Sequence, residues 1–207
     1  MQLWRIPLDG YSPACLAVLR GYLDDDERTR MDALAFPLLR DRFVVAHGAQ
    51  RTILGRALGT APGAIRFSFG PNGKPALAGG SPVGFSLSHS DDLAVVAVTS
   101  GCAVGVDVER ERPDVSHESI GRQFFSQAEA DALVALPPEE RQAAFFRGWT
   151  RKEALVKMLG LGLADPVDTF DAARFTMTDL DLGAGYVGAV VVEGAPPLEI
   201  TRWEWVP

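Results

Sequence analysis

Apolar and polar positions alternate over several short segments, which we expect to be strands. In the segment 104–108, valines take every second position. Asp107 and Glu109 occupy positions between or just after these valines. Successive side chains of a strand point to opposite faces, so the valines predict a core face and the two carboxylates share the other. Gly105 leaves room for a close approach beside them.

The same reasoning along the chain predicts both strands and helices. The segments expected to be strands are 1–8, 65–69, 83–87, 93–99, 103–109, 170–176, 186–192 and 198–205. The segments expected to be helices are 12–20, 25–35, 38–58, 126–136 and 138–159. Segment 70–75 is expected to be a tight turn, and segment 113–121 a loop or a short helix.

The helix ends carry capping signals. Ser126 with Glu129 forms an expected capping box, and Gly59 and Gly160 end the two long helices. Each half of the chain has helices followed by antiparallel strands, so the sequence predicts an α+β fold. The order predicts two similar subdomains, residues 1–101 and 102–207.

Composition narrows the class of protein. The chain has 207 residues, of which 47% are hydrophobic and 23% are charged, as in ordinary globular proteins. Its net charge of −7 disfavours nucleic-acid binding. No apolar run reaches the roughly 18 residues of a membrane span. Cys15 and Cys102 have no metal-binding spacing and predict free thiols in the cytoplasm.

The two carboxylates of the acidic strand need a compensating positive charge, because like charges side by side repel. Carboxylate oxygens suit a hard cation such as Mg²⁺ or Mn²⁺. The alternative is a solvated strand end, which is the commoner origin of an Asp-x-Glu pattern alone. Basic residues also gather in the first half of this acidic chain. They are Arg40, Arg42, Arg51, Arg56, Arg66 and Lys74.

Two further segments carry candidate chemistry. Glu153 and Lys157 share a face of the last long helix, either as a surface ion pair or as a third carboxylate beside a phosphate contact. Ser88, His89 and Ser90 do not form a hydrolase site, because neighbouring side chains of an extended segment point opposite ways. A polar Ser-His pair at a strand end suits hydrogen bonding to a bound phosphate.

These motifs together resemble a known family. "GPNGKP", "FSLSHS", "GVDVER" and "FFRGWTRKEALVKMLGLGL" occur in the order and spacing of the 4′-phosphopantetheinyl transferases of the larger, Sfp type. "QRTILGRALG" is similar to a further segment of that family. The resemblance covers residues 25 to 165, and its last two motifs are specific in combination.

The resemblance implies a monomeric pseudo-dimer of two α+β halves with coenzyme A in the cleft between them. The enzyme would transfer the 4′-phosphopantetheine arm to a serine of an apo acyl or peptidyl carrier protein and release adenosine 3′,5′-bisphosphate. The implied Mg²⁺ ligands are Asp107, Glu109 and Glu153. The implied coenzyme A contacts are Arg42, Arg51, Lys74, Ser88, His89 and Lys157. For the 3′-phosphate, the loosely matched segment 27–30 offers Arg28 or Arg30.

The chemistry of the residues agrees with this reaction. A serine that attacks a pyrophosphate linkage must lose its proton, and Glu153 is the expected base, with Glu109 as the second choice. Lys157 is the expected point charge on the α-phosphate. The alternatives are a non-catalytic coenzyme A-binding regulator, a metal-dependent phosphohydrolase on the same scaffold, and an interaction module with surface acids. The sequence selects no single carrier protein or pathway.

Overall fold

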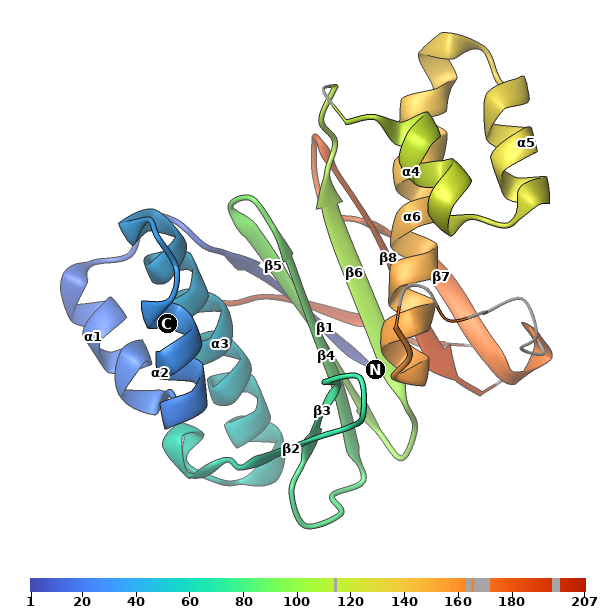
Figure 1. Ribbon diagram of the computed structural model, residues 1–207. Coiled ribbons are helices and arrows are strands. Elements are labelled where there is room, and N and C mark those ends of the chain that lie inside the picture. The colour runs from blue at the N-terminus through green and yellow to red at the C-terminus, as the bar shows by residue number, and fades with distance from the viewer. Residues whose placement is uncertain (114, 163–164, 166–171, 195–197) are drawn as a thin grey trace.

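The computed structural model describes residues 1–113, 115–162, 165, 172–194 and 198–207 (Figure 1). In the first half of the chain the elements are β1 (Gln2–Pro7), α1 (Pro13–Tyr22), α2 (Asp25–Asp32), α3 (Pro37–Leu58), the short 3₁₀ turn η1 (Pro62–Ala64), β2 (Phe67–Phe69), β3 (Pro75–Leu77), β4 (Val83–Ser90) and β5 (Leu93–Ser100). In the second half they are β6 (Val104–Arg110), α4 (His117–Phe124), α5 (Gln127–Ala135), α6 (Pro138–Leu159), η2 (Ala172–Arg174), β7 (Phe175–Asp181), β8 (Tyr186–Glu193) and β9 (Thr201–Glu204).

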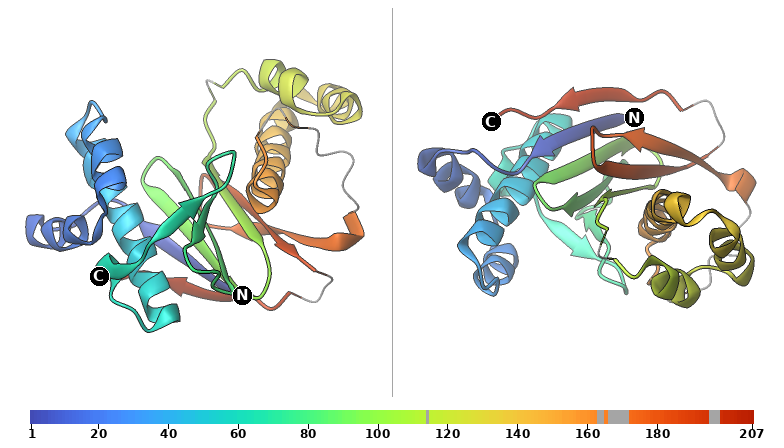
Figure 2. Two further views of the ribbon diagram at one scale, coloured as in Figure 1. Left: turned by 60° about the horizontal axis from the view of Figure 1, so that its bottom comes forward. Right: turned by 90° about the horizontal axis from the view of Figure 1, so that it is seen from above.

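The described strands form two main sheets and one separate hairpin. The first sheet has the order β4-β5-β1-β9, the second has the order β6-β8-β7, and β2 pairs only with β3. Helices α1–α3 and helices α4–α6 lie at opposite ends of the molecule (Figure 2). The predicted α+β fold is confirmed, with antiparallel pairing throughout except between β1 and β9.

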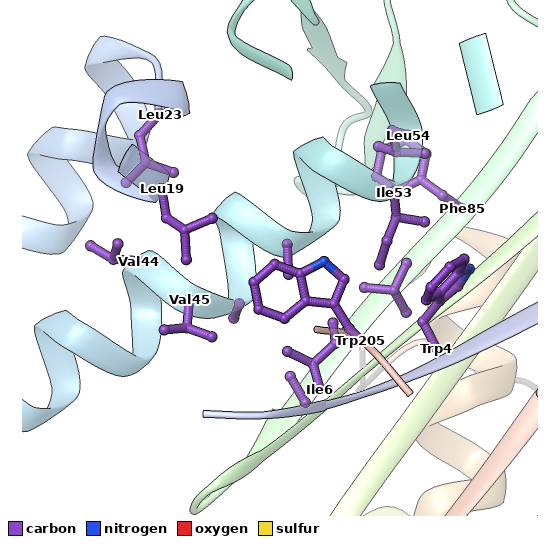
Figure 3. Close-up of a cluster of buried hydrophobic side chains, with 14 of the residues drawn as sticks. Trp4, Ile6, Leu19, Leu23, Val44, Val45, Ile53, Leu54, Phe85 and Trp205 are labelled. Carbon is purple, nitrogen blue, oxygen red and sulfur yellow. The ribbon is translucent and has the colours of Figure 1, made fainter. Parts of the chain in front are cut away.

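Strand β9 crosses from the second half of the chain to the first sheet, where it pairs in parallel with β1. Trp205, just after this strand, is only 2% exposed. Its indole lies beside Ile6, Val45 and Leu19 in the core under α3 (Figure 3). A division of the chain at residues 101 and 102 therefore follows the order of the elements but leaves β9 packed on the first subdomain.

Most predicted helix ends are observed. Ser126 and Glu129 form the reciprocal hydrogen bonds of a capping box, and Gly59 and Gly160 end α3 and α6 with left-handed φ angles of 64° and 71°. The strand expected at 83–87 continues to Ser90, because it keeps pairing with β5. The strand expected at 170–176 begins only at Phe175, and residues 170 and 171 lie outside the described residues.

Helix α6 lies directly on β6, and Gly105 is the residue that permits this. A Cβ atom at position 105 would lie 2.0 Å from the carbonyl oxygen of Ala154 and 2.3 Å from the amide nitrogen of Met158. Both are backbone atoms of the helix and cannot turn away. On the other face of β6 the three valines are at most 1% exposed, in a core shared with β1, β5 and β8. Both expectations for this strand are confirmed.

Gly105→Ala is therefore expected to destabilise the protein by at least about 3 kcal/mol, the upper range for overpacking, because α6 must move away from β6. The matched control is Gly21→Ala near the end of α1, where the added Cβ meets no atom within 4 Å. That change should stabilise the helix by about 0.5–1 kcal/mol. Urea unfolding of both variants measures the contrast, and equal stabilities would contradict the packing argument.

Candidate active site

The two main sheets meet along β4 and β6, which are edge strands of their own sheets. Serine hydroxyls join them. The Oγ atoms of Ser86, Ser88 and Ser90 accept hydrogen bonds from the backbone N–H groups of residues 106, 108 and 110, at 3.1, 3.4 and 3.1 Å. We call these three residues the serine ladder. All three are buried, so the ladder gives partners to strand-edge N–H groups that water does not reach.

The serine ladder also holds the two carboxylates of β6. A hydroxyl can accept and donate at once. Ser88 Oγ donates to Asp107 Oδ1, and Ser90 Oγ donates to Glu109 Oε2, both at 2.7 Å. The side chains of the acidic strand are therefore fixed by the neighbouring sheet.

Asp107 is the most buried of the candidate acids, at 2% exposure. Lys157 Nζ of α6 donates to its Oδ1 at 2.6 Å and to Ser88 Oγ at 3.0 Å. Its other oxygen, Oδ2, is buried and has no hydrogen-bond partner among the described residues. Burial raises the pKa of Asp107, although Lys157 and Ser88 act in the opposite direction.

Glu109 and Glu153 lie close enough to Asp107 for its charge to change their pKa values. Burial, with a further contribution from Asp107, raises the pKa of each of these two carboxyls above its ordinary value. Ser90 opposes this rise at Glu109, and Lys157 opposes it at Glu153. Within the described part of the chain the side chain of Glu153 makes no hydrogen bond or ion pair. We call Asp107, Glu109 and Glu153 the carboxylate group.

The carboxylate group has the donor chemistry of a hard-cation site, because it offers only oxygen atoms and one of them is buried without a partner. The three side chains do not converge on one point in this structure. Across the described ranges, no three His, Cys, Asp or Glu side chains lie close enough together to hold a metal ion. Lys157 supplies the positive charge beside Asp107.

Two cavities adjoin these residues. The first, of about 350 Å³, is bounded by α2 and α3, by the β2–β3 hairpin, by β4 and by the end of α6, and Lys157 lines it. The second, of about 930 Å³, lies between the α2–α3 region and the ends of β4 and β6, and Glu109 lines it. Arg30 and His89 line both. The cavities thus share Arg30 and His89 beside the acids, and burial lowers the pKa of His89.

The predicted basic contacts are not all free to face a ligand. His89 and Lys157 line the cavities, as does Lys74. However, Lys74 Nζ donates to the carbonyl oxygen of Met158 at 2.7 Å. Arg42 lines the second cavity but is paired with Asp9 and Asp91, each at 2.8 Å. Ser88 is 6% exposed and already donates to Asp107.

Arg51 is not brought to either cavity. It is 0% exposed, and its guanidinium donates to Glu27 at 2.7 Å, to Asp24 and to the carbonyl oxygen of Ile65 at 3.1 Å. It also lies 5.0 Å from the ring centre of Phe67, which forms part of the first cavity's wall. The donors of Arg51 are already used inside the protein, so this geometry does not favour its predicted contact with coenzyme A, which stays a prediction.

Sequence reasoning missed several residues of the site. Ser90 holds Glu109, and Phe67, Phe69 and Phe85 line the first cavity. A signal for the serine ladder was present, because serines at every second position of "FSLSHS" must share one face of a strand. Nothing in the local sequence marks the phenylalanines as cavity walls.

The comparisons with known proteins agree with the geometry. A family model described as the 4′-phosphopantetheinyl transferase superfamily matches residues 103–204. The 4′-phosphopantetheinyl transferase HetI of Nostoc sp. is 37% identical over 209 residues, which cover 94% of this chain and 88% of HetI. The transferase Sfp of Bacillus subtilis is 32% identical, over 72% of this chain and 70% of Sfp. The transferase AcpT of Escherichia coli K12 is 39% identical, over 54% of this chain and 56% of AcpT.

Its α+β fold and its similarity to these transferases make the chain a group-transfer enzyme of the phosphopantetheinyl class. The chain belongs to the 4′-phosphopantetheinyl transferase superfamily. Enzymes of this family transfer phosphopantetheine from coenzyme A to carrier proteins. In the part of the chain that the structure describes, no helix is long and apolar enough to cross a membrane.

Arg51→Met is expected to destabilise the fold by about 3–5 kcal/mol, because the buried carboxylate of Glu27 loses the guanidinium that neutralises it and keeps only its contacts with His47 and the backbone N–H of Asp24. The double variant Arg51→Met/Glu27→Gln should recover part of this loss. Burial raises the pKa of Glu27. Hydrogen bonds from His47 and the backbone of Asp24, together with the charge of Arg51, outweigh this effect and hold the pKa below its ordinary 4.5.

The sign of the pH dependence follows from that lowered pKa. The stability contributed by ionised Glu27 is fully present above pH 4.5 and is lost as the pH falls through the folded-state pKa. Urea unfolding against pH measures both effects. An Arg51→Met protein of normal stability that binds coenzyme A weakly would restore Arg51 to the ligand site.

Proposed function

We propose that this enzyme carries out a Mg²⁺-dependent transfer of the 4′-phosphopantetheine arm of coenzyme A to a serine hydroxyl of an apo acyl or peptidyl carrier protein. The second product is adenosine 3′,5′-bisphosphate. The observation that carries the proposal is that Lys157, paired with Asp107, lines one cavity and Glu109 lines the other, while both cavities share Arg30 and His89. Carboxylates that could hold a cation or accept a proton thus lie close to Arg30, His89 and Lys157, which could bind phosphates.

Coenzyme A is proposed to occupy the first cavity and to extend past His89 toward the second. Flat aromatic rings, Phe67, Phe69 and Phe85, line the first cavity together with Pro75, and such walls suit a purine base. Arg30, His89 and Lys157 are placed for its phosphates. Arg30 makes no ion pair within the described residues. Its guanidinium lies over the ring of Phe43, at 5.7 Å.

The carboxylate group is proposed to hold Mg²⁺, with Mn²⁺ as the other candidate. The support is the unpartnered Oδ2 of Asp107, with Glu109 and Glu153 as the further oxygen donors. When bound, the metal would neutralise charge on the diphosphate. The serine ladder would keep Asp107 and Glu109 in place, since both accept its hydroxyls.

Glu153 is proposed to take the proton of the attacking serine. It is free of hydrogen bonds within the described residues, and its raised pKa makes it a stronger base than an ordinary glutamate. Glu109 is the second choice, since one of its oxygens accepts from Ser90. Lys157 would stabilise the leaving phosphate, which requires its ammonium to be shared between Asp107 and the ligand.

The enzyme is proposed to act as a monomer on carrier proteins in the cytoplasm. Both sides of the cleft come from one chain, which supports action as a monomer, with a coenzyme A-binding N-terminal subdomain and a metal-binding C-terminal one. The family supports carrier proteins as macromolecular partners, and the net charge of −7 disfavours nucleic acid. Free Cys15 and Cys102 support a cytoplasmic location, and no membrane partner is proposed.

Intact-mass analysis of apo-carriers incubated with the protein, coenzyme A and Mg²⁺ tests the proposed function. We expect a carrier to gain the phosphopantetheine mass, and adenosine 3′,5′-bisphosphate to appear in equal amount. Chelation of the metal should stop both. Release of phosphopantetheine into solution would indicate a phosphohydrolase instead, and coenzyme A binding without turnover on any carrier would indicate a regulator.

Glu153→Gln is expected to lower turnover by about two to four orders of magnitude, the usual contribution of a general base, while coenzyme A still binds. The matched control is Glu140→Gln, an exposed carboxylate on the same helix, which should leave turnover unchanged. Calorimetry measures binding and the intact-mass assay measures turnover. Near-normal turnover of Glu153→Gln would assign the base to Glu109.

A further inference from the structure

The turn of the β2–β3 hairpin reaches across the cleft to the end of α6. Lys74 Nζ donates to the carbonyl oxygen of Met158 at 2.7 Å and lies 3.5 Å from that of Val104. Asn72 Nδ2 donates to the carbonyl oxygen of Gly160 at 3.1 Å. Both side chains come from the first half of the chain and both main acceptors end the helix of the second half.

These acceptors are groups that need a partner. The last carbonyls of a helix have no intrahelical donor, and a cation there also interacts favourably with the helix dipole. The stem of Lys74 packs closely on the helix end, because a Cβ at Gly160 would lie 3.3 Å from its Cδ. Burial lowers the pKa of Lys74, as expected of an ammonium turned into the protein.

The hairpin has little else to fix its tip. Among the described strands, β2 and β3 pair only with each other and join neither main sheet. Yet this hairpin forms one wall of the first cavity, and Lys157, Gly160 and Leu161 at the end of α6 form part of another. The contacts of Asn72 and Lys74 therefore connect the two walls directly, and the lysine's acceptor is the residue that follows Lys157.

We propose that Lys74 is a positioning residue which, with Asn72, latches the hairpin to the end of α6 and so sets the width of the coenzyme A cavity and the place of Lys157. This inference rests on the proposed function for the identity of the ligand. It replaces the expectation that Lys74 binds a phosphate, because its ammonium already faces carbonyl oxygens of α6. A latch predicts that uncharged Asn72 matters in the same way.

The test compares Lys74→Met, which keeps the stem, with Asn72→Ala, the double variant and Lys74→Arg. The ligands are coenzyme A and adenosine, which carries no phosphate. Each single change should weaken binding of both ligands by about tenfold, near the value of one or two lost hydrogen bonds. The double variant should be no weaker than the worse single variant, because either loss opens the latch. Lys74→Arg should restore most of the affinity.

A phosphate contact gives the opposite pattern. Lys74→Met would then weaken coenzyme A but leave adenosine binding unchanged, and Asn72→Ala would have no effect; that result overturns the proposal. Amide hydrogen exchange adds a readout without ligand or turnover. In the Lys74→Met and Asn72→Ala proteins, the amides of 157–161 should exchange faster at unchanged global stability.

The matched control is Lys152→Met, a lysine of α6 outside both cavities, which should change neither exchange nor binding. Exchange that stays at the wild-type rate in Lys74→Met and Asn72→Ala overturns the latch. If no carrier is modified by the wild type while the exchange and double-variant results hold, the proposed function fails and the latch stands.

Discussion

The serine ladder is the interaction on which the site depends. Strand β6 is enclosed on every side: β8 pairs with one edge, the serine hydroxyls of β4 satisfy the other, α6 covers one face and the valine core the opposite face. Backbone pairing between β4 and β6 would have closed the two sheets into one. Hydroxyls separate the edges slightly and, because they also donate, they hold Asp107 and Glu109 from the neighbouring sheet. One set of side chains thus stabilises the contact between the subdomains and orients the acids.

That arrangement concentrates negative charge where water is scarce. Burial raises the pKa of all three members of the carboxylate group, and the charge of Asp107 adds to the rise at Glu109 and Glu153. A raised folded-state pKa means that the unfolded chain releases protons more readily, so these groups weaken folding as the pH rises through their folded-state values. Lys157 offsets part of this cost by pairing with Asp107. A site that is unfavourable alone would gain most from a bound cation, which is the energetic argument for the proposed Mg²⁺ at these acids.

Short stretches of sequence were enough to predict most helices and strands. The spacing of apolar residues, the capping residues and the glycines at helix ends are all signals that lie within a few positions of one another. The alternation around Gly105 predicted both faces of β6, and the capping box at Ser126 predicted the start of α5. The direction of long basic side chains was not predictable. Arg51 meets Glu27 across 24 positions and Lys74 meets Met158 across 84, so residue type alone cannot show that their donors are used within the fold. The serine ladder could have been predicted from its period of two, whereas the return of β9 to the first sheet carried no local signal.

The return of β9 has a mechanical consequence for the cleft. A single short link between β5 and β6 would allow the two halves to rotate about it, because one covalent crossing is a natural hinge. The chain crosses a second time before β9, and Trp205 anchors that crossing in the core below α3. Two crossings together with the serine ladder fix the halves as nearly one body. Among the described strands, β2 and β3 join neither main sheet, and the turn between them contacts the end of α6 through Asn72 and Lys74, so we expect the freedom left around the first cavity to lie in this hairpin. The ability of the cavity to admit and hold a long ligand is therefore expected to reside in that hairpin rather than in movement of one subdomain against the other.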